Sequence, residues 1–132
     1  MAAQLSVAVR NARLDAIETT IGTAPTLEIR TGAQPANCAA ADSGTLLASM
    51  TLPSSWMNAA SGGTMTLSGT WEDLIPNNAG TAEHFRIKQG ATCGLQGSVT
   101  ATGGGGDIEL SSVSITTTAV TITAFTITDA NS

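Results

Sequence analysis

The first part of the chain carries a helical pattern of apolar residues. Residues 2–21 contain neither glycine nor proline, and alanine is frequent among them. Apolar side chains recur there at spacings of three, four and seven residues, which places them along one side of a helix. They are Val7, Leu14, Ile17 and Ile21. Gly22 and Pro25 follow, and both residue types are common just beyond a helix end, so we expect the helix to end near Ile21.

This helix has two alternative roles. Val7, Leu14 and Ile21 repeat every seven residues, the spacing found in helices that pair with copies of themselves. Three such turns are few, so packing against the rest of the same chain is favoured. The charged residues between them are typical of a solvated outer face. These charged residues are Arg10, Arg13, Asp15 and Glu18.

After Pro25 the pattern changes to an alternation of apolar and polar residues. Leu27 and Ile29 alternate with Glu28 and Arg30, as in a strand with one buried face. The same alternation predicts further strands, and these cover residues 45–52, 64–68, 83–88 and 95–101.

The segments between these strands carry residues that interrupt regular structure. Residues 32–44 contain proline, asparagine and aspartate and are predicted to be a long loop, and residues 72–82, with proline, two asparagines and glycine, are predicted to be a loop. Residues 53–57 begin with proline, which favours one helical turn. The run of glycines at 103–106 predicts a flexible connection.

Residues 107–116 and 119–128 predict a terminal pair of strands, although the apolar side chains change face partway along each one. A β-bulge near Ser111 and another near Ala124 would transfer the later side chains to the opposite face. Alternatively, both faces of these strands are covered, one by a facing sheet and one by the N-terminal helix.

These elements predict a mainly β fold. About six or seven short strands at regular spacing, rich in threonine, valine and isoleucine, are typical of an antiparallel β-sandwich or jelly roll. At 132 residues the chain fits one domain. We therefore expect residues 1–22 to form a helix that packs on the domain or on a neighbour, and residues 23–132 to form a single β-sandwich domain.

Composition argues against several classes of function. The net charge is −5 and the five basic residues are scattered, so we expect no nucleic-acid partner. No apolar run approaches the roughly 18 residues that cross a bilayer, so we expect no membrane span. The start of the sequence lacks the basic and apolar regions of a signal peptide, which predicts synthesis and use in the cytoplasm.

Cys38 and Cys93 are far apart in the sequence and form no metal-binding or redox motif. In a reducing cytoplasm two unpaired, partly buried thiols are favoured. A disulfide between them is geometrically feasible. We expect the unpaired state.

Groups suited to catalysis are few. His84 is the single histidine, and alternation places it on the polar face opposite Phe85, where an exposed structural histidine is favoured over a catalytic one. The G-x-S-x-G motif is absent, and no phosphate-binding sequence follows the glycines at 103–106. Asp107 and Glu109 share one strand face, where a solvated surface is favoured over a calcium site. We expect no enzyme activity, no metal and no cofactor.

The tryptophans are the remaining candidates for a binding site. Trp71 lies beside Glu72 and Asp73, an aromatic and acidic combination that suits sugars, and Trp56 could supply a second platform. The chain has only two tryptophans, two phenylalanines and no tyrosine, and tryptophans in a small sandwich are usually core or interface anchors.

A lightly charged surface rich in threonine, serine and alanine is easily dehydrated, which favours contacts with other proteins. The candidate interface residues are the apolar residues of the N-terminal helix and the two tryptophans. They are Val7, Leu14, Ile17, Ile21, Trp56 and Trp71.

Several segments of the chain resemble a group of small virion structural proteins of tailed bacteriophages and prophages, and the similarity extends over nearly the whole chain. These segments are residues 12–18 (ARLDAIE), 21–33 (IGTAPTLEIRTGA), 38–44 (CAAADSG) and 120–125 (VTITAF). In size and strand pattern the group is similar to the jelly-roll cement, or decoration, proteins that bind the outside of phage heads. Its motifs are structural, so the resemblance transfers no functional residue.

The resemblance implies a capsid cement protein that bridges neighbouring major capsid subunits and stabilises the shell. Its partners would be the major capsid protein and further copies of itself, as a dimer or trimer, on the surface of a virion assembled in the host cytoplasm. One alternative is a tail or fibre component that binds a host glycan through Trp71, Glu72, Asp73 and Trp56. Another is a small hydrolase. Buried tryptophans would favour the cement protein, and tryptophans exposed in a groove would favour the glycan-binding module.

Overall fold

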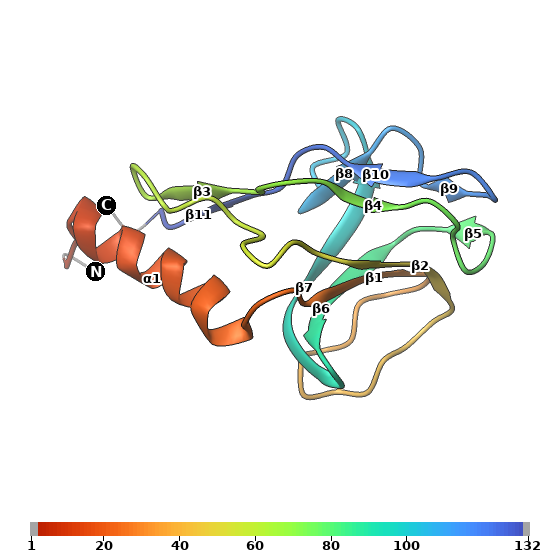
Figure 1. Cartoon of the computed structure of the whole chain (residues 1–132), viewed down its shortest axis with the longest axis horizontal. Helices are drawn as coiled ribbons and strands as arrows, with labels where there is room; N and C mark the ends of the chain where they lie inside the picture. The colour runs from red at the N-terminus through yellow and green to blue at the C-terminus, as the bar shows by residue number, and fades with distance from the viewer. Residues whose placement is uncertain (1–2, 131–132) are drawn as a thin grey trace.

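The computed structural model describes residues 3–130, and the fold is mainly β with one short helix (Figure 1). The helix α1 (Val7–Ile21) comes first, as predicted. The strands are β1 (Thr26–Arg30), β2 (Leu46–Thr51), β3 (Thr64–Thr66), β4 (Trp71–Asp73), β5 (Gly80–Thr81), β6 (His84–Gln89), β7 (Thr92–Ala101), β8 (Ile108–Leu110), β9 (Ser114–Ile115), β10 (Val120–Ile122) and β11 (Thr126–Thr128). This arrangement confirms the predicted sandwich-like fold with a short N-terminal helix.

The first layer is a five-stranded sheet with the order β2-β1-β6-β7-β8. Its pairs are antiparallel except β7–β8, which is parallel. Leu27 faces Ile87 and Ile29 faces Phe85 across β1 and β6, so the apolar faces of both strands line the same side of the sheet. All four side chains are buried there. The alternation in the sequence therefore identified this half of the core.

The second layer is an antiparallel ribbon with interruptions. Strands β3, β4 and β5 run away from α1, and β9, β10 and β11 return beside them (Figure 1). Thr66 faces Thr126 and Trp71 faces Ile122, so five residues along one strand correspond to four along the other. This one-residue offset lies near Ala124, where a change of face was predicted. Like a β-bulge, it transfers the later side chains to the opposite face of the strand.

The prediction that residues 107–116 and 119–128 pair with each other is wrong. Of the strands in these segments, β8 pairs with β7, and β9, β10 and β11 pair with β5, β4 and β3. The face change near Ser111 arises because the chain passes there from the five-stranded sheet into the ribbon. Two further predictions fail: residues 53–57 form no helical turn, and residues 72–82 contain strand structure from β4 and β5.

The two layers enclose a core that contains every aromatic side chain of the sequence. Ring centroids lie 6.1 Å apart for Trp56 and Trp71, 5.6 Å for Trp71 and Phe125, and 5.7 Å for Phe85 and Phe125. Both indole N–H groups find backbone acceptors, which removes the cost of burying them. The acceptors are Gly22 O for Trp56 and Ser68 O for Trp71, each at 3.1 Å.

Polar side chains as well as apolar ones attach α1 to its own domain. Leu14 is buried, whereas Asn11, Asp15 and Glu18 each accept a hydrogen bond from a backbone N–H of the segment that leads into β3. The donors are Gly63 N, Ala60 N and Met57 N, respectively. The prediction of a solvated outer face is therefore wrong for Asp15 and Glu18. Within residues 3–130, α1 falls short of the length and apolar character needed to span a membrane.

Candidate functional site

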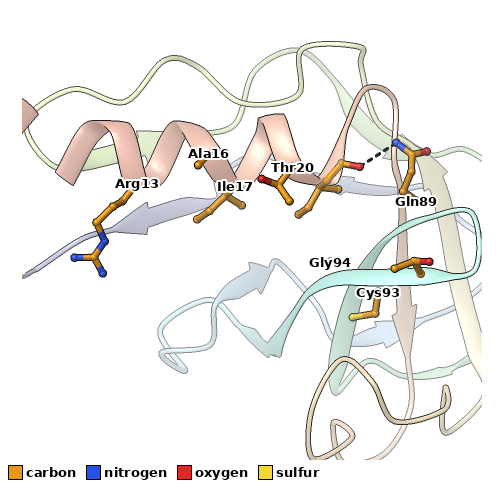
Figure 2. A pocket seen from close by; sticks show the side chains of 9 residues that line it. Arg13, Ala16, Ile17, Thr20, Gln89, Cys93 and Gly94 are labelled. Carbon is orange, nitrogen blue, oxygen red and sulfur yellow. Dashed lines mark hydrogen bonds between the residues drawn. The ribbon is translucent and has the colours of Figure 1, made fainter. Parts of the chain in front are cut away.

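An open groove of about 660 Å³ lies between α1 and the hairpin formed by β6 and β7 (Figure 2). We call it the α1 groove. Helix α1 contributes Arg13, Ala16, Ile17, Thr20 and Ile21, and the hairpin contributes Gln89, Thr92, Cys93 and Gly94. Two of the predicted interface residues, Ile17 and Ile21, thus line one wall of the α1 groove, and the hairpin forms the other wall.

Local contacts fix the end of α1 against the hairpin. The side-chain amide of Gln89 donates to Ile21 O at 3.2 Å and to Thr23 O at 2.9 Å, so it satisfies one carbonyl in the last turn of the helix and one just beyond it. Gly94 lies against Ile21, and a Cβ at position 94 would come within 2.5 Å of Ile21 Cγ1. Glycine at position 94 therefore allows this close approach. Together with the hydrogen bonds of Gln89, the contact holds the two walls of the groove in place.

The polar groups around the α1 groove are largely paired. The Gln89 side-chain amide is hydrogen-bonded to the end of α1. The Arg13 guanidinium lies 3.2 Å from the Asp129 carboxylate, and the Arg13 side chain is 56% exposed. Within residues 3–130, no group of three or more histidine, cysteine, aspartate or glutamate side chains is placed to hold a metal ion. The groove thus offers a half-buried aliphatic floor with one cation at its rim, a chemistry that suits an apolar protein segment.

A second apolar surface lies in the connection between β4 and β5. Leu74 and Ile75 are 66% and 83% exposed, and with Pro76 they form what we call the 74–76 tip. The tip lies at the end of the molecule away from α1 (Figure 1). The sequence prediction treated this segment only as a loop. Two adjacent aliphatic residues inside a loop were the signal that could have identified it.

The polar face of the five-stranded sheet is covered by residues 32–44. The guanidinium of Arg86, 2% exposed, donates to Asn37 O, Ala40 O and Asp42 Oδ1 at 3.0, 2.9 and 2.9 Å. Its Nε donates to Gln96 Oε1 at 3.1 Å. Asp42 also lies 2.6 Å from Lys88 Nζ. This ionic network holds the loop on the sheet.

The same covering loop corrects the prediction for His84. Alternation did place it on the polar face opposite Phe85, but that face is covered and His84 is fully buried. Its Nδ1 lies 2.7 Å from Gly32 O in the loop. His84 therefore packs beneath the loop, and the prediction of an exposed histidine is wrong.

The expectation of unpaired thiols is also wrong. Cys38 and Cys93 form a disulfide, with Cα atoms 5.2 Å apart. Cys38 lies in the covering loop and Cys93 in β7, so the bond fastens the loop to the edge of the hairpin beside the α1 groove. Their distance in sequence gave no indication of this proximity, which depends on how the loop folds back over the sheet.

The other candidate sites are not assembled. Trp56 and Trp71 are fully buried, so neither ring is presented to a partner or a sugar. Leu14 lies in the core, whereas Val7 is 46% exposed near the start of α1. The carboxylates of Asp73, Asp107 and Glu109 are engaged with backbone N–H groups. Asp73 accepts from Ser49 N and Ile75 N, Asp107 accepts from Ser98 N, and Glu109 accepts from Gly105 N.

Asp42 gives the ionic network a predictable response to acid. The hydrogen bond from Lys88 lowers the pKa of the Asp42 carboxyl below its ordinary value of 3.8; partial burial opposes this, and Arg86 and Arg30 lower it further. A carboxyl whose pKa is lower in the folded state stabilises the fold above its unfolded pKa, and this contribution is lost as the pH falls through the folded pKa.

We therefore expect Asp42→Asn to remove part of the acid sensitivity. Between about pH 4 and pH 2 the free energy of unfolding of the variant should fall less steeply than that of the wild type. Urea denaturation at a series of pH values measures both slopes. Glu72→Gln changes an exposed carboxylate outside the network and should keep the wild-type slope. Identical slopes for Asp42→Asn and the wild type would contradict the assignment.

Comparison of the chain with protein-family models, with curated proteins and with solved structures finds no match to any of them.

Proposed function

We propose that this protein is a non-enzymatic structural subunit of a bacteriophage virion, a capsid cement protein that binds the outside of the head and bridges neighbouring major capsid subunits. The observation that carries the proposal is the pair of apolar surfaces, the α1 groove and the 74–76 tip, which are formed by different elements of one small body. A bridging subunit needs two separate contact surfaces. The resemblance of the sequence to phage virion proteins supports the choice of particle.

The surroundings of the α1 groove are held in fixed positions, and this supports a mechanical role. The disulfide and the ionic network fasten residues 32–44 beside the α1 groove, and Gln89 fixes the helix end. Surfaces that are ordered before binding lose little conformational entropy on contact. A cement subunit acts only through such contacts, because no chemical step contributes to its effect.

The position of the tryptophans favours cement over the glycan-binding alternative. Stacking on sugars requires an accessible aromatic face, and Trp56 and Trp71 are both fully buried. The surroundings of His84 support a non-enzymatic role, since its Nδ1 lies against the carbonyl of Gly32 beneath the covering loop. We accordingly propose protein partners, namely the major capsid protein and further copies of this chain.

Binding to purified heads that lack the protein tests this function. We expect binding to saturate at a fixed, symmetry-related number of copies per head, because each lattice site offers the same surface. Attachment should vary weakly with salt, since only 11% of the residues are charged and few ion pairs are available to be screened. Quantitative mass spectrometry of the washed particles measures the copy number.

Heads that already carry the protein provide the matched control and should take up no more of it. A handful of copies per virion, attachment abolished by moderate salt, or displacement by free sugar would each contradict the cement function. The last outcome would instead point to the tail or fibre alternative.

A further inference from the structure

We propose that Cys38 and Cys93 form their disulfide in the already folded protein, by exchange with a small-molecule disulfide, after the subunit has bound to a head. The inference rests on the proposed function, because the head and the cell in which it assembles set the time of the reaction. The bond acts on the stability of the bound subunit and leaves unchanged the contacts by which the subunit binds.

The loop that carries Cys38 is held on the sheet by bonds other than the disulfide. The Arg86 guanidinium donates to Asn37 O at 3.0 Å and to Ala40 O at 2.9 Å, so it holds the chain on both sides of Cys38. Asn37 Oδ1 also accepts from Ala40 N at 3.0 Å and closes the turn that contains Cys38. These bonds contain no sulfur, so a loop with a free Cys38 thiol keeps its position on the sheet.

Cys93 is fixed by strand pairing. It lies in β7 opposite Lys88 of β6, and its Cα atom is 5.2 Å from that of Cys38. Two cysteines at this separation can be joined without movement of the backbone. In the unfolded chain the same residues are 55 positions apart. Folding therefore raises the effective concentration of one thiol at the other, and the folded dithiol is oxidised more readily than the unfolded one.

Both cysteines border open hollows, which gives a small reagent access to them. Cys93 lines the α1 groove (Figure 2). Cys38 and Cys93 together line a second open hollow of about 620 Å³, to which residues 39–42 also contribute. Both residues are half-buried. A thiolate in such a position is accessible enough to attack a small disulfide.

The exchange takes two steps. One protein thiol loses its proton, and its thiolate attacks a sulfur of the small disulfide RSSR; the S–S bond of the reagent breaks, and RS⁻ leaves and takes up a proton. The second protein thiolate then attacks the protein sulfur of this mixed disulfide and releases the other RS⁻, which becomes RSH. In sum, two protein thiols and RSSR give one protein disulfide and two RSH, so two electrons pass from the cysteines to the reagent.

The difference in redox conditions between the inside and the outside of the host sets the time of this reaction. Thiols stay reduced in a cytoplasm, where the proposed head assembles, whereas disulfides persist outside the cell. The subunit therefore binds as the dithiol and is oxidised once the particle has been released. A bound subunit that unfolds leaves its site, and the bond opposes unfolding because it restricts the unfolded chain. Oxidation thus keeps bound subunits in place.

A redox titration of the free protein tests whether the bond forms in the folded state. The protein is purified under reductant and equilibrated in mixtures of reduced and oxidised glutathione, in native buffer and in concentrated urea, and mass spectrometry after alkylation measures the ratio of disulfide to dithiol. We expect this ratio to be at least about a hundredfold higher in native buffer, and circular dichroism should show that the reduced protein is folded. An unfolded reduced protein, or ratios within about tenfold of each other, would overturn the inference.

Two variants test the part played by the loop. Arg86→Gln removes the hydrogen bonds on both sides of Cys38 and should lower the ratio in native buffer at least about fivefold. Asn37→Ala changes the same turn at an exposed position, and it decides the question if Arg86→Gln, whose native side chain is buried, does not fold. Gln34→Ala is the matched control, because Gln34 is exposed in the same loop and lies outside these hydrogen bonds. It should titrate like the wild type, and a wild-type ratio in the folded variants would contradict the inference.

A second experiment tests the order of events on heads that lack the protein. Reduced subunits should bind in the presence of reductant, and oxidised glutathione added to the washed particles should convert them to the disulfide without loss of copies. On heating, oxidised subunits should be released at a temperature at least about 5 °C above that of reduced ones. Cys38→Ala with Cys93→Ala is the control, and its release temperature should not respond to the oxidant.

Binding by the oxidised form alone, bound subunits that glutathione fails to oxidise, or equal release temperatures would each overturn the inference. Failure of the proposed function gives a different result, in which neither redox form binds to heads while the free protein still titrates with the expected difference between native buffer and urea. In that case the bond still forms in the folded chain, but the capsid role and the timing that depends on it are withdrawn.

Discussion

Trp71→Ala is expected to lower the free energy of unfolding by about 3–5 kcal/mol. Trp71 is fully buried, its ring contacts both Trp56 and Phe125, and its indole N–H donates to Ser68 O. Truncation would leave a cavity at the centre of the aromatic cluster. Domains of this size are stable by about 5–15 kcal/mol, so the variant would lose a large fraction of its stability. Urea denaturation followed by far-ultraviolet circular dichroism measures the loss.

Two further variants make this result specific. Trp71→Phe keeps much of the buried ring and should lose less than Trp71→Ala, whereas Leu74→Ala, at a side chain 66% exposed, should change stability little. A loss below about 1 kcal/mol for Trp71→Ala would contradict its place in the core. Such a result would restore the aromatic platform that the glycan-binding alternative requires.

Replacement of both cysteines, Cys38→Ala with Cys93→Ala, should lower the free energy of unfolding by about 3–4 kcal/mol. The disulfide joins residues 55 positions apart, and its removal frees that segment in the unfolded chain. Arg86 and Asp42 still hold the covering loop in the folded state, so the main effect falls on the unfolded ensemble. Denaturation with urea compares the double variant with the oxidised wild type.

Thiol labelling provides a second measurement of the same bond. Alkylation of the denatured wild type without reductant should label no cysteine, and prior reduction should expose two labelled thiols. Wild type treated with reductant should then unfold at the midpoint of the double variant. Two labelled thiols without reductant, or a midpoint unchanged by reductant, would contradict the pairing.

The sequence could predict those elements whose signals are local. Leu27 and Ile29 identify the buried face of β1 because side chains alternate along any strand, and Gly22 marks the end of α1 because glycine readily adopts its positive φ of 102°. Alternation specifies a face but not a partner. The strands within residues 107–128 were therefore found in outline but assigned to the wrong neighbours.

The candidate site was only half predictable for the same reason. Ile17 and Ile21 stand out in the helical pattern, but Gln89 and Gly94 join them only through the packing of α1 on the hairpin. The burial of His84, Arg86 and Lys88 depends on a loop that returns from more than forty positions earlier in the chain. A local sequence pattern contains no information about a distant loop that packs over the strand.

The interrupted ribbon has a consequence for the nascent chain during translation. Strands β3, β4 and β5 are synthesised well before their partners β11, β10 and β9. Until then Trp71 lacks Phe125 and half of the sandwich has an open edge. The ribbon therefore folds only after residues 114–128 have been synthesised, and crowded polysomes expose its unpaired strands to neighbouring chains in the meantime.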